Sequence, residues 1–143
     1  MANLWNTMGY SYRNNAPVDT SAKVYAVTKD ATNSLRSAEF PHNCEIESVE
    51  IFLTSISSAT QVTMYLARDS TGDVAITPGG TTGATQAIGT GITSGTGSVV
   101  FDVETDFNYD SNVTGATPGT LYVVLSVDAG SATADVRVNW RGI

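Results

Sequence analysis

One stretch of the chain places oxygen-bearing side chains on every second residue. Residues 101–110 have the sequence FDVETDFNYD, in which acidic or amide side chains alternate with mostly apolar ones. The acidic members of this row are Asp102, Glu104, Asp106 and Asp110. Such spacing would suit a pair of catalytic carboxylates, a calcium site, or the solvent-facing side of a β-strand.

The catalytic interpretation of this acidic row has the least support. Side chains two residues apart on a strand point the same way and lie about 7 Å apart. Two catalytic carboxylates also need different environments, one that raises a pKa and one that keeps its group ionised. Nothing near the row in sequence predicts an apolar pocket around one carboxylate, so we do not expect catalysis there.

Calcium needs several oxygen ligands that wrap around the ion, as a flexible loop can do. The acidic row lacks two features of such a loop, because Phe107 replaces the required glycine and Val113 the terminal glutamate. We therefore predict a half-buried strand whose acidic side faces water. Calcium at the acidic row, or in the loop around Asp69 and Asp73, is kept as an alternative.

The segment PHNC contains His42 and Cys44, the single histidine and the single cysteine of the chain. One histidine and one cysteine do not complete the four-ligand shell of zinc. Side chains two residues apart on an extended chain point in parallel, which does not suit a Cys–His catalytic pair. The glycine-rich segment 89–97 lacks the lysine and the strand-to-helix context of a phosphate-binding loop. We expect no enzymatic activity.

The composition indicates one β-rich domain. The chain has 143 residues, and 41% of them are apolar, while only 15% are charged. Threonine, serine and glycine take the place of charged residues, and this favours strands and turns over helices. The net charge is −7, with no cation between Asp69 and Val136. Binding to nucleic acid or to anionic lipid is therefore not expected.

Short apolar and alternating segments, separated by turn-forming residues, predict a series of strands. The main segments are AKVYAVT (22–28), EIESVEIFLTSI (45–56), TQVTMYLAR (60–68), SVVFDVETDF (98–107), TPGTLYVVLSVD (117–128) and ATADVRVNWRG (132–142). Residues 78–97 are rich in glycine and threonine and predict a long loop or a weakly paired edge strand. We predict an all-β fold, with a single β-sandwich or jelly-roll-like domain of about seven to nine antiparallel strands over residues 21–143.

Residues 1–20 carry Trp5, Tyr10 and Tyr12 without clear periodicity, and we predict an extended N-terminal arm. Aromatic rings on an arm are expected to dock on the domain or on a partner. The first residues have neither the early positive charge nor the apolar run of a signal peptide. No apolar run approaches the length of a membrane span. A single cysteine also excludes an intrachain disulfide, so synthesis in a cytoplasm is expected.

The segment SVVFDVETDFNYDSNVTGATPGTLYVVLSVDAGSATADVRVNW resembles, in the order of its strands and turns, β-sandwich modules of bacterial surface and bacteriophage virion proteins. The chain as a whole resembles bacteriophage head decoration (cement) proteins. This resemblance implies a non-enzymatic structural protein of the virion, made in the host cytoplasm. It also implies binding to the major capsid protein, stabilisation of the capsid lattice, and a homo-oligomer such as a trimer. Trp5, Tyr10 and Tyr12 would then contact the capsid or a sister subunit.

The alternative function is that of a carbohydrate-binding, lectin-like β-sandwich module, either calcium-dependent or calcium-independent. Exposed aromatic rings stack on sugar rings in many such modules. The aromatic candidates for this contact are Trp5, Tyr10, Tyr12, Tyr109 and Trp140, of which Trp140 is expected to face inward because it alternates with Arg137, Asn139 and Arg141. A glycan partner therefore stands beside the capsid as a second hypothesis. Apart from calcium, no cofactor is expected.

Overall fold

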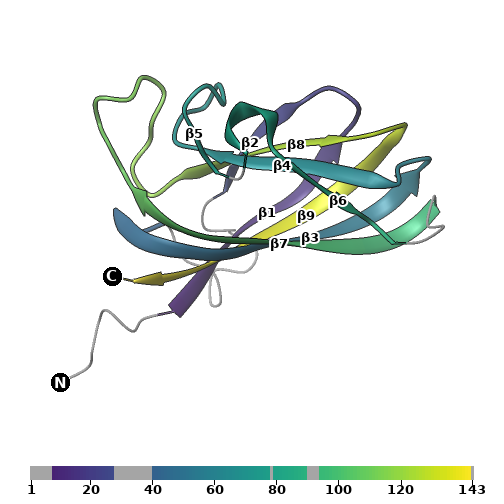
Figure 1. Cartoon of the computed structure of the whole chain (residues 1–143), viewed down its shortest axis with the longest axis horizontal. Coiled ribbons are helices and arrows are strands. Elements are labelled where there is room, and N and C mark those ends of the chain that lie inside the picture. Colours follow the sequence, from purple (N-terminus) through teal and green to yellow (C-terminus); the bar gives the residue numbers. More distant parts are fainter. Residues whose placement is uncertain (1–7, 28–39, 78, 90–93, 143) are drawn as a thin grey trace.

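The computed structural model describes residues 8–27, 40–77, 79–89 and 94–142. In these ranges the chain forms nine strands and one short 3₁₀ turn (Figure 1). The strands are β1 (Met8–Val18), β2 (Lys23–Val27), β3 (Asn43–Ser57), β4 (Gln61–Ala67), β5 (Ala75–Thr77), β6 (Ala84–Ala87), β7 (Ser94–Asn108), β8 (Leu121–Val127) and β9 (Ser131–Gly142), and the 3₁₀ turn η3 is Gly80–Thr82. The described residues contain no helix that is long and apolar enough to cross a membrane.

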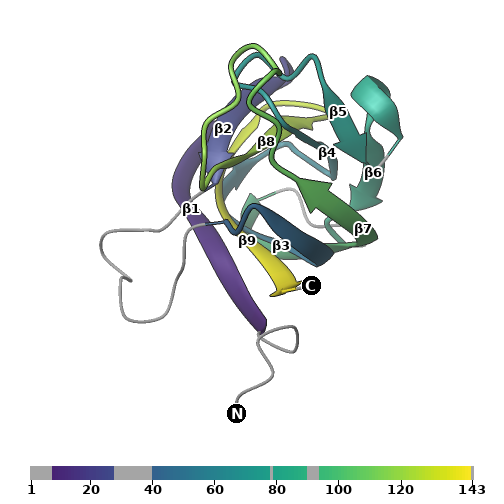
Figure 2. The same cartoon turned by 90° about the vertical axis from the view of Figure 1, so that its left-hand side faces the viewer.

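The strands form two antiparallel sheets that stack face to face (Figures 1 and 2). The first sheet has the order β1-β9-β3-β7, and the second sheet has the order β2-β8-β4-β5, with β6 also paired to β4. Both sheets combine strands that are far apart in sequence, as expected for a sandwich. The prediction of an all-β sandwich with about seven to nine antiparallel strands is confirmed.

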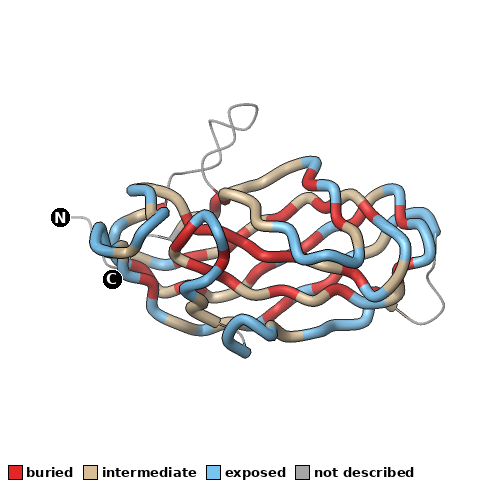
Figure 3. The backbone as a smooth tube through the Cα atoms, turned by 90° about the horizontal axis from the view of Figure 1, so that it is seen from above, coloured by how far each residue is buried: buried red, intermediate tan, exposed pale blue. Residues whose placement is uncertain are grey.

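The apolar side chains between the two sheets form one continuous core. Figure 3 marks the buried residues in red along the backbone. Strand β9 shows the underlying pattern, because every second residue is buried while the residues between them are not. The buried residues of β9 are Ala132, Ala134, Val136, Val138 and Trp140. Along β3 the alternation shifts between Ile46 and Ser48, where the register with β9 also shifts. This bulge lets β3 bend while both of its halves stay on the core.

The segment 78–97 contributes a short edge strand, one of the two structures predicted for it. Strand β6 pairs with β4 from Gln61↔Ala87 to Met64↔Ala84, and Ile88 is buried next to it. Residue 78 and residues 90–93 lie outside the described ranges. The sequence from Ser94 onward already belongs to β7, which is therefore longer than the predicted strand.

Residues 8–18 are not an arm, and the predicted boundary at residue 20 is wrong for them. They form β1, an edge strand that pairs with β9 over its whole length. Ala16 and Val18 enter the core, and the Trp140 indole Nε1 donates a hydrogen bond to Ser11 Oγ at 3.2 Å. Residues 1–7, which include Trp5, lie outside the described ranges. The arm prediction can therefore apply only to residues that precede β1.

A single methyl group tests whether β1 is part of the sandwich. A Cβ atom at Gly9 would lie 2.5 Å from Cζ2 of Trp140. Gly9→Ala should therefore destabilise the fold by roughly 1–3 kcal/mol, as overpacking of a core does. The measurement is the midpoint of urea unfolding, with Ser98→Ala, an exposed change on β7, as the control. A Gly9→Ala variant as stable as the control would contradict the packing of β1 on β9.

Candidate binding face

The two sheets differ in how their outer surfaces are covered. On the second sheet a small apolar cluster forms outside the main core, from Ala67, Tyr122 and Val124 with Val24, Ala26 and Tyr65 packed against it. Tyr65 donates a hydrogen bond from its hydroxyl to the Gly72 carbonyl at 2.6 Å, and Tyr122 donates one to Thr117 Oγ1 at 3.2 Å. The loops that carry Gly72 and Thr117 therefore cover this sheet, and β8 is buried on both of its faces.

The first sheet instead exposes aromatic and apolar side chains on its outer surface. Phe52, on the inner strand β3, is 48% exposed, and Val100, on the edge strand β7, is 51% exposed. Facing residues on neighbouring strands form three cross-strand rows. These rows are Tyr12–Arg137–Glu50–Val100, Tyr10–Asn139–Ser48–Asp102, and Asp135–Phe52–Ser98. We call these eleven residues the binding face.

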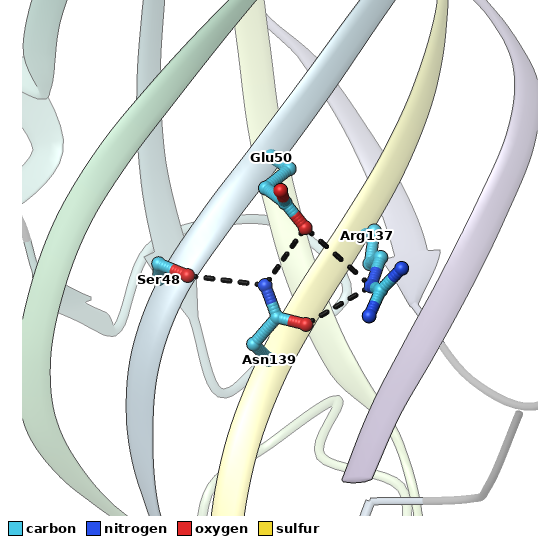
Figure 4. Close-up of polar contacts among 4 residues, drawn as sticks. All are labelled: Ser48, Glu50, Arg137 and Asn139. Carbon is cyan, nitrogen blue, oxygen red and sulfur yellow. Dashed lines mark hydrogen bonds and ion pairs between the residues drawn. The ribbon is translucent and has the colours of Figure 1, made fainter.

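A polar network holds the centre of the binding face in one arrangement (Figure 4). Asn139 Nδ2 donates hydrogen bonds to Glu50 Oε2 at 2.9 Å and to Ser48 Oγ at 3.1 Å. Arg137 Nε donates to Asn139 Oδ1 at 3.0 Å and lies 3.4 Å from Glu50 Oε2. An exposed ion pair of this kind contributes only about 0–1 kcal/mol to stability. The main consequence of the network is therefore the fixed orientation of its donors and acceptors.

The aromatic side chains of β1 are joined to this network. The guanidinium carbon of Arg137 lies 4.1 Å from the centroid of the Tyr10 ring, a cation–π contact. The Tyr10 and Tyr12 rings meet edge to face, with centroids 5.2 Å apart. These contacts place two tyrosines and one arginine side by side on an ordered surface. Such an arrangement can bind a ligand or a protein, but it offers no nucleophile.

A shallow groove of about 420 Å³ lies on the binding face and extends past it to Asn14. Its walls are Tyr12, Asn14, Glu50, Phe52, Asp135 and Arg137, from β1, β3 and β9. A bulge in β1 shapes one wall, because the register with β9 shifts between Arg13 and Ala16 and Asn15 takes a φ of 55°. The Asn15 amide donates a hydrogen bond to Asp135 Oδ1 at 2.9 Å, which fixes the bulge against the groove.

The structure brings together two of the three residues predicted for partner contact. Tyr10 and Tyr12 lie next to each other on the binding face, and Trp5 lies outside the described residues. Sequence reasoning missed the other main members, which are Glu50, Phe52, Asp135, Arg137 and Asn139. Alternation along β3 and β9 predicts that these side chains point outward. It does not predict that strands so far apart in sequence lie side by side.

The acidic row occupies the exposed side of edge strand β7, as the strand interpretation predicted. Phe101 and Phe107 are buried, whereas Asp102, Glu104 and Asp106 are exposed. Asp110 lies in the turn after β7, where its Oδ1 accepts a hydrogen bond from the Asn112 amide at 2.9 Å. Among the described residues, no group of three or more histidine, cysteine, aspartate or glutamate side chains is placed to hold a metal ion.

Asp69, the other residue considered for calcium, organises its own loop. Its side chain is only 2% exposed and accepts hydrogen bonds from the Val74 amide at 2.8 Å and the Asp73 amide at 3.1 Å. The Thr71 hydroxyl donates a third bond at 2.6 Å. Burial would raise the pKa of Asp69, but these hydrogen bonds outweigh it and lower the pKa below its usual value. The carboxylate thus stabilises the loop that covers the second sheet.

His42 and Cys44 both pack against other side chains of the sandwich. The His42 ring lies against Tyr109, with ring centroids 5.2 Å apart. Cys44 is fully buried in the core. Burial, with a further contribution from Asp106, raises the pKa of the Cys44 thiol to about 12. A thiol in this state forms very little thiolate at neutral pH, so it does not suit nucleophilic chemistry.

Comparisons with known proteins were made by family, by sequence and by structure. No protein-family model matches the chain, and no curated protein sequence matches it either. The structure is similar to the cyanophage Pam1 capsid asymmetric unit, with a TM-score of 0.47, 12% identity, and coverage of 100% of this chain and 90% of that one. It is also similar to the Tobacco streak virus coat protein dimer, with a TM-score of 0.39, 13% identity, and coverage of 99% and 90%.

A third similar structure is that of Tomato aspermy virus, with a TM-score of 0.39, 14% identity, and coverage of 95% of this chain and 78% of that one. All three proteins come from viruses. Similarity at this level does not transfer a function from those proteins to this chain.

The raised pKa of Cys44 predicts that the folded protein resists thiol reagents. With a disulfide reagent at pH 8, the native protein should show almost no labelling, because both burial and the pKa of about 12 suppress the thiolate. In denaturant the same sample should label one thiol per chain. Rapid labelling of the native protein would contradict this account of Cys44 and would reopen the question of a reactive thiol.

Proposed function

We propose that this protein is a non-enzymatic structural protein of a virion, which decorates the capsid and stabilises its lattice. In this proposal the major capsid protein is the partner, and the binding face with the residues that precede β1 makes the contact. The protein would act as a homo-oligomer such as a trimer. The observation that carries the proposal is the binding face itself, which is ordered, aromatic and exposed.

The chemistry of the binding face supports a protein partner. Tyrosine and arginine are enriched among the residues that dominate interface energies, and here Tyr10, Tyr12 and Arg137 are in mutual contact. Phe52 and Val100 add exposed apolar area next to them. Because the polar network fixes these side chains before binding, little conformational entropy would be lost on docking. A preformed surface of this kind suits repeated binding to a regular lattice.

The composition of the core is consistent with a protein that is made in a reducing cell and remains folded outside it. The sandwich has no disulfide to form or lose, because its single cysteine, Cys44, is buried in the core. Its stability rests on apolar packing between two sheets, which does not depend on the redox state of the surroundings. The acidic net charge of −7 favours solubility at the high local concentration of a crowded particle surface.

The test measures binding to capsids while leaving the fold intact. Deletion of residues 1–20 would remove β1 and would confuse unfolding with loss of contact, so the deletion should end before Met8. Removal of residues 1–7, and separately Tyr10→Ala with Tyr12→Ala, should each weaken capsid binding by roughly tenfold, the effect of losing an aromatic anchor. The assay is co-sedimentation with capsids assembled from the major capsid protein of the same genome.

The matched control is Val74→Ala, which truncates a 38% exposed apolar side chain in the loop after β4, away from the binding face. It should bind capsids as the unmodified protein does. Melting temperatures of all variants separate loss of contact from loss of fold. Binding at full strength by both the deletion and the tyrosine variants, or an equal loss in the Val74 control, would refute the proposal.

A further inference from the structure

We infer that the groove on the binding face is a calcium-independent binding site for neutral saccharides. This activity goes beyond capsid decoration, because it concerns a small polar ligand and not a protein surface. The groove has a volume of about 420 Å³ and is largely open to solvent. That volume is within the range of ligand sites, and an open groove leaves room for a saccharide chain longer than the groove itself.

The aromatic walls of the groove match the apolar face of a sugar ring. Phe52, on β3, is 48% exposed, and its ring has no polar group that would compete with the ligand. Tyr12, on β1, stands across β9 from it and is held edge to face against Tyr10. Aromatic rings provide a rigid apolar surface on which C–H groups of a sugar can pack, and a tyrosine hydroxyl adds a polar edge.

The polar walls of the groove match the hydroxyl groups at the edge of a sugar. Glu50 and Asp135 supply carboxylate acceptors, and Arg137 supplies donors in a planar fork. Each is held in place without a ligand, since Asp135 accepts the Asn15 amide and Glu50 is bonded to Asn139. A hydroxyl group both donates and accepts, so it can bond to carboxylate and guanidinium together. Fixed partners of this kind reduce the entropy lost on binding.

The charges of the groove favour a neutral saccharide over an acidic one. Two carboxylates, Glu50 and Asp135, face one guanidinium, Arg137, whose charge Glu50 already balances at 3.4 Å. The whole chain has a net charge of −7, which repels polyanions. Calcium has no role at this groove, because among the described residues no three acidic or metal-binding side chains converge there or elsewhere.

The experiment is affinity electrophoresis of the full chain in native gels that contain dextran, mannan or galactan. At least one of these neutral polysaccharides should retard the protein, with and without EDTA, while alginate, an acidic one, should not. Phe52→Ala should weaken the retardation about fivefold, which corresponds to the roughly 1 kcal/mol of one aromatic contact. Tyr12→Ala should have a similar effect if its melting temperature shows that it is folded.

The matched control is Val74→Ala, which truncates a 38% exposed apolar side chain in the loop after β4, away from the binding face and its groove. Its retardation should equal that of the unmodified protein. The inference is overturned if no neutral polysaccharide retards the chain, if EDTA abolishes retardation, or if Val74→Ala weakens it as much as Phe52→Ala. Light scattering adds one more outcome: a dimer that Phe52→Ala dissociates would assign the groove to self-association instead.

The saccharide test and the capsid test fail independently. The gels contain free protein and no capsid, so the absence of retardation leaves capsid decoration untouched. Loss of capsid binding on removal of residues 1–7 does not alter the groove, whose walls all lie between Tyr12 and Arg137 in the sequence. Phe52→Ala reports on the groove, and the deletion reports on the capsid contact.

Discussion

The packing of Trp140 against β1 is the contact on which the binding face depends. The indole ring leaves no room for a side chain at Gly9, and its Nε1 donates a hydrogen bond to Ser11. Phe40 also packs against the Trp140 ring, with centroids 6.4 Å apart. Because Gly9 and Ser11 face Trp140, the alternate residues Tyr10 and Tyr12 point outward, where Tyr10 contacts Arg137. The packing of Trp140 in the core thus determines that Tyr10 and Tyr12 lie on the surface.

Among the described residues, loops cover the outer surface of the second sheet but not that of the first, so the first sheet is the one whose outer surface is free to bind a partner. The second sheet carries loops on its outer surface, organised by the hydrogen bonds of Asp69 and Tyr65. The first sheet carries instead a network of Arg137, Asn139 and Glu50, whose exposed groups remain accessible. Both arrangements follow from the same two-residue alternation of strands, which sends one set of side chains inward and leaves the other for loops, solvent or a ligand.

Much of the fold could be predicted from alternation, because β3, β7 and β9 each bury apolar residues on one side only. Strand β1 could not be predicted in this way, because the apolar pattern of its own sequence is weak. The Trp140 side chain of β9 fills the space next to Gly9 and Ser11 instead. The binding face was also beyond reach. Its contacts join residues far apart in sequence, such as Asn139 with Ser48, 91 positions away. Nothing local in the sequence indicates that β9 lies between β1 and β3.

The most direct test of the central claim is hydroxyl-radical footprinting of the chain, free and bound to capsids assembled from the major capsid protein of the same genome. The claim is that the outer surface of the first sheet is the surface that binds. We predict that Tyr10, Tyr12 and Phe52 become protected on binding, while Val74 and Tyr65, which lie with the second sheet, keep their labelling rates. Protection of Val74 and Tyr65 with unchanged labelling of Tyr10, Tyr12 and Phe52 would contradict the account.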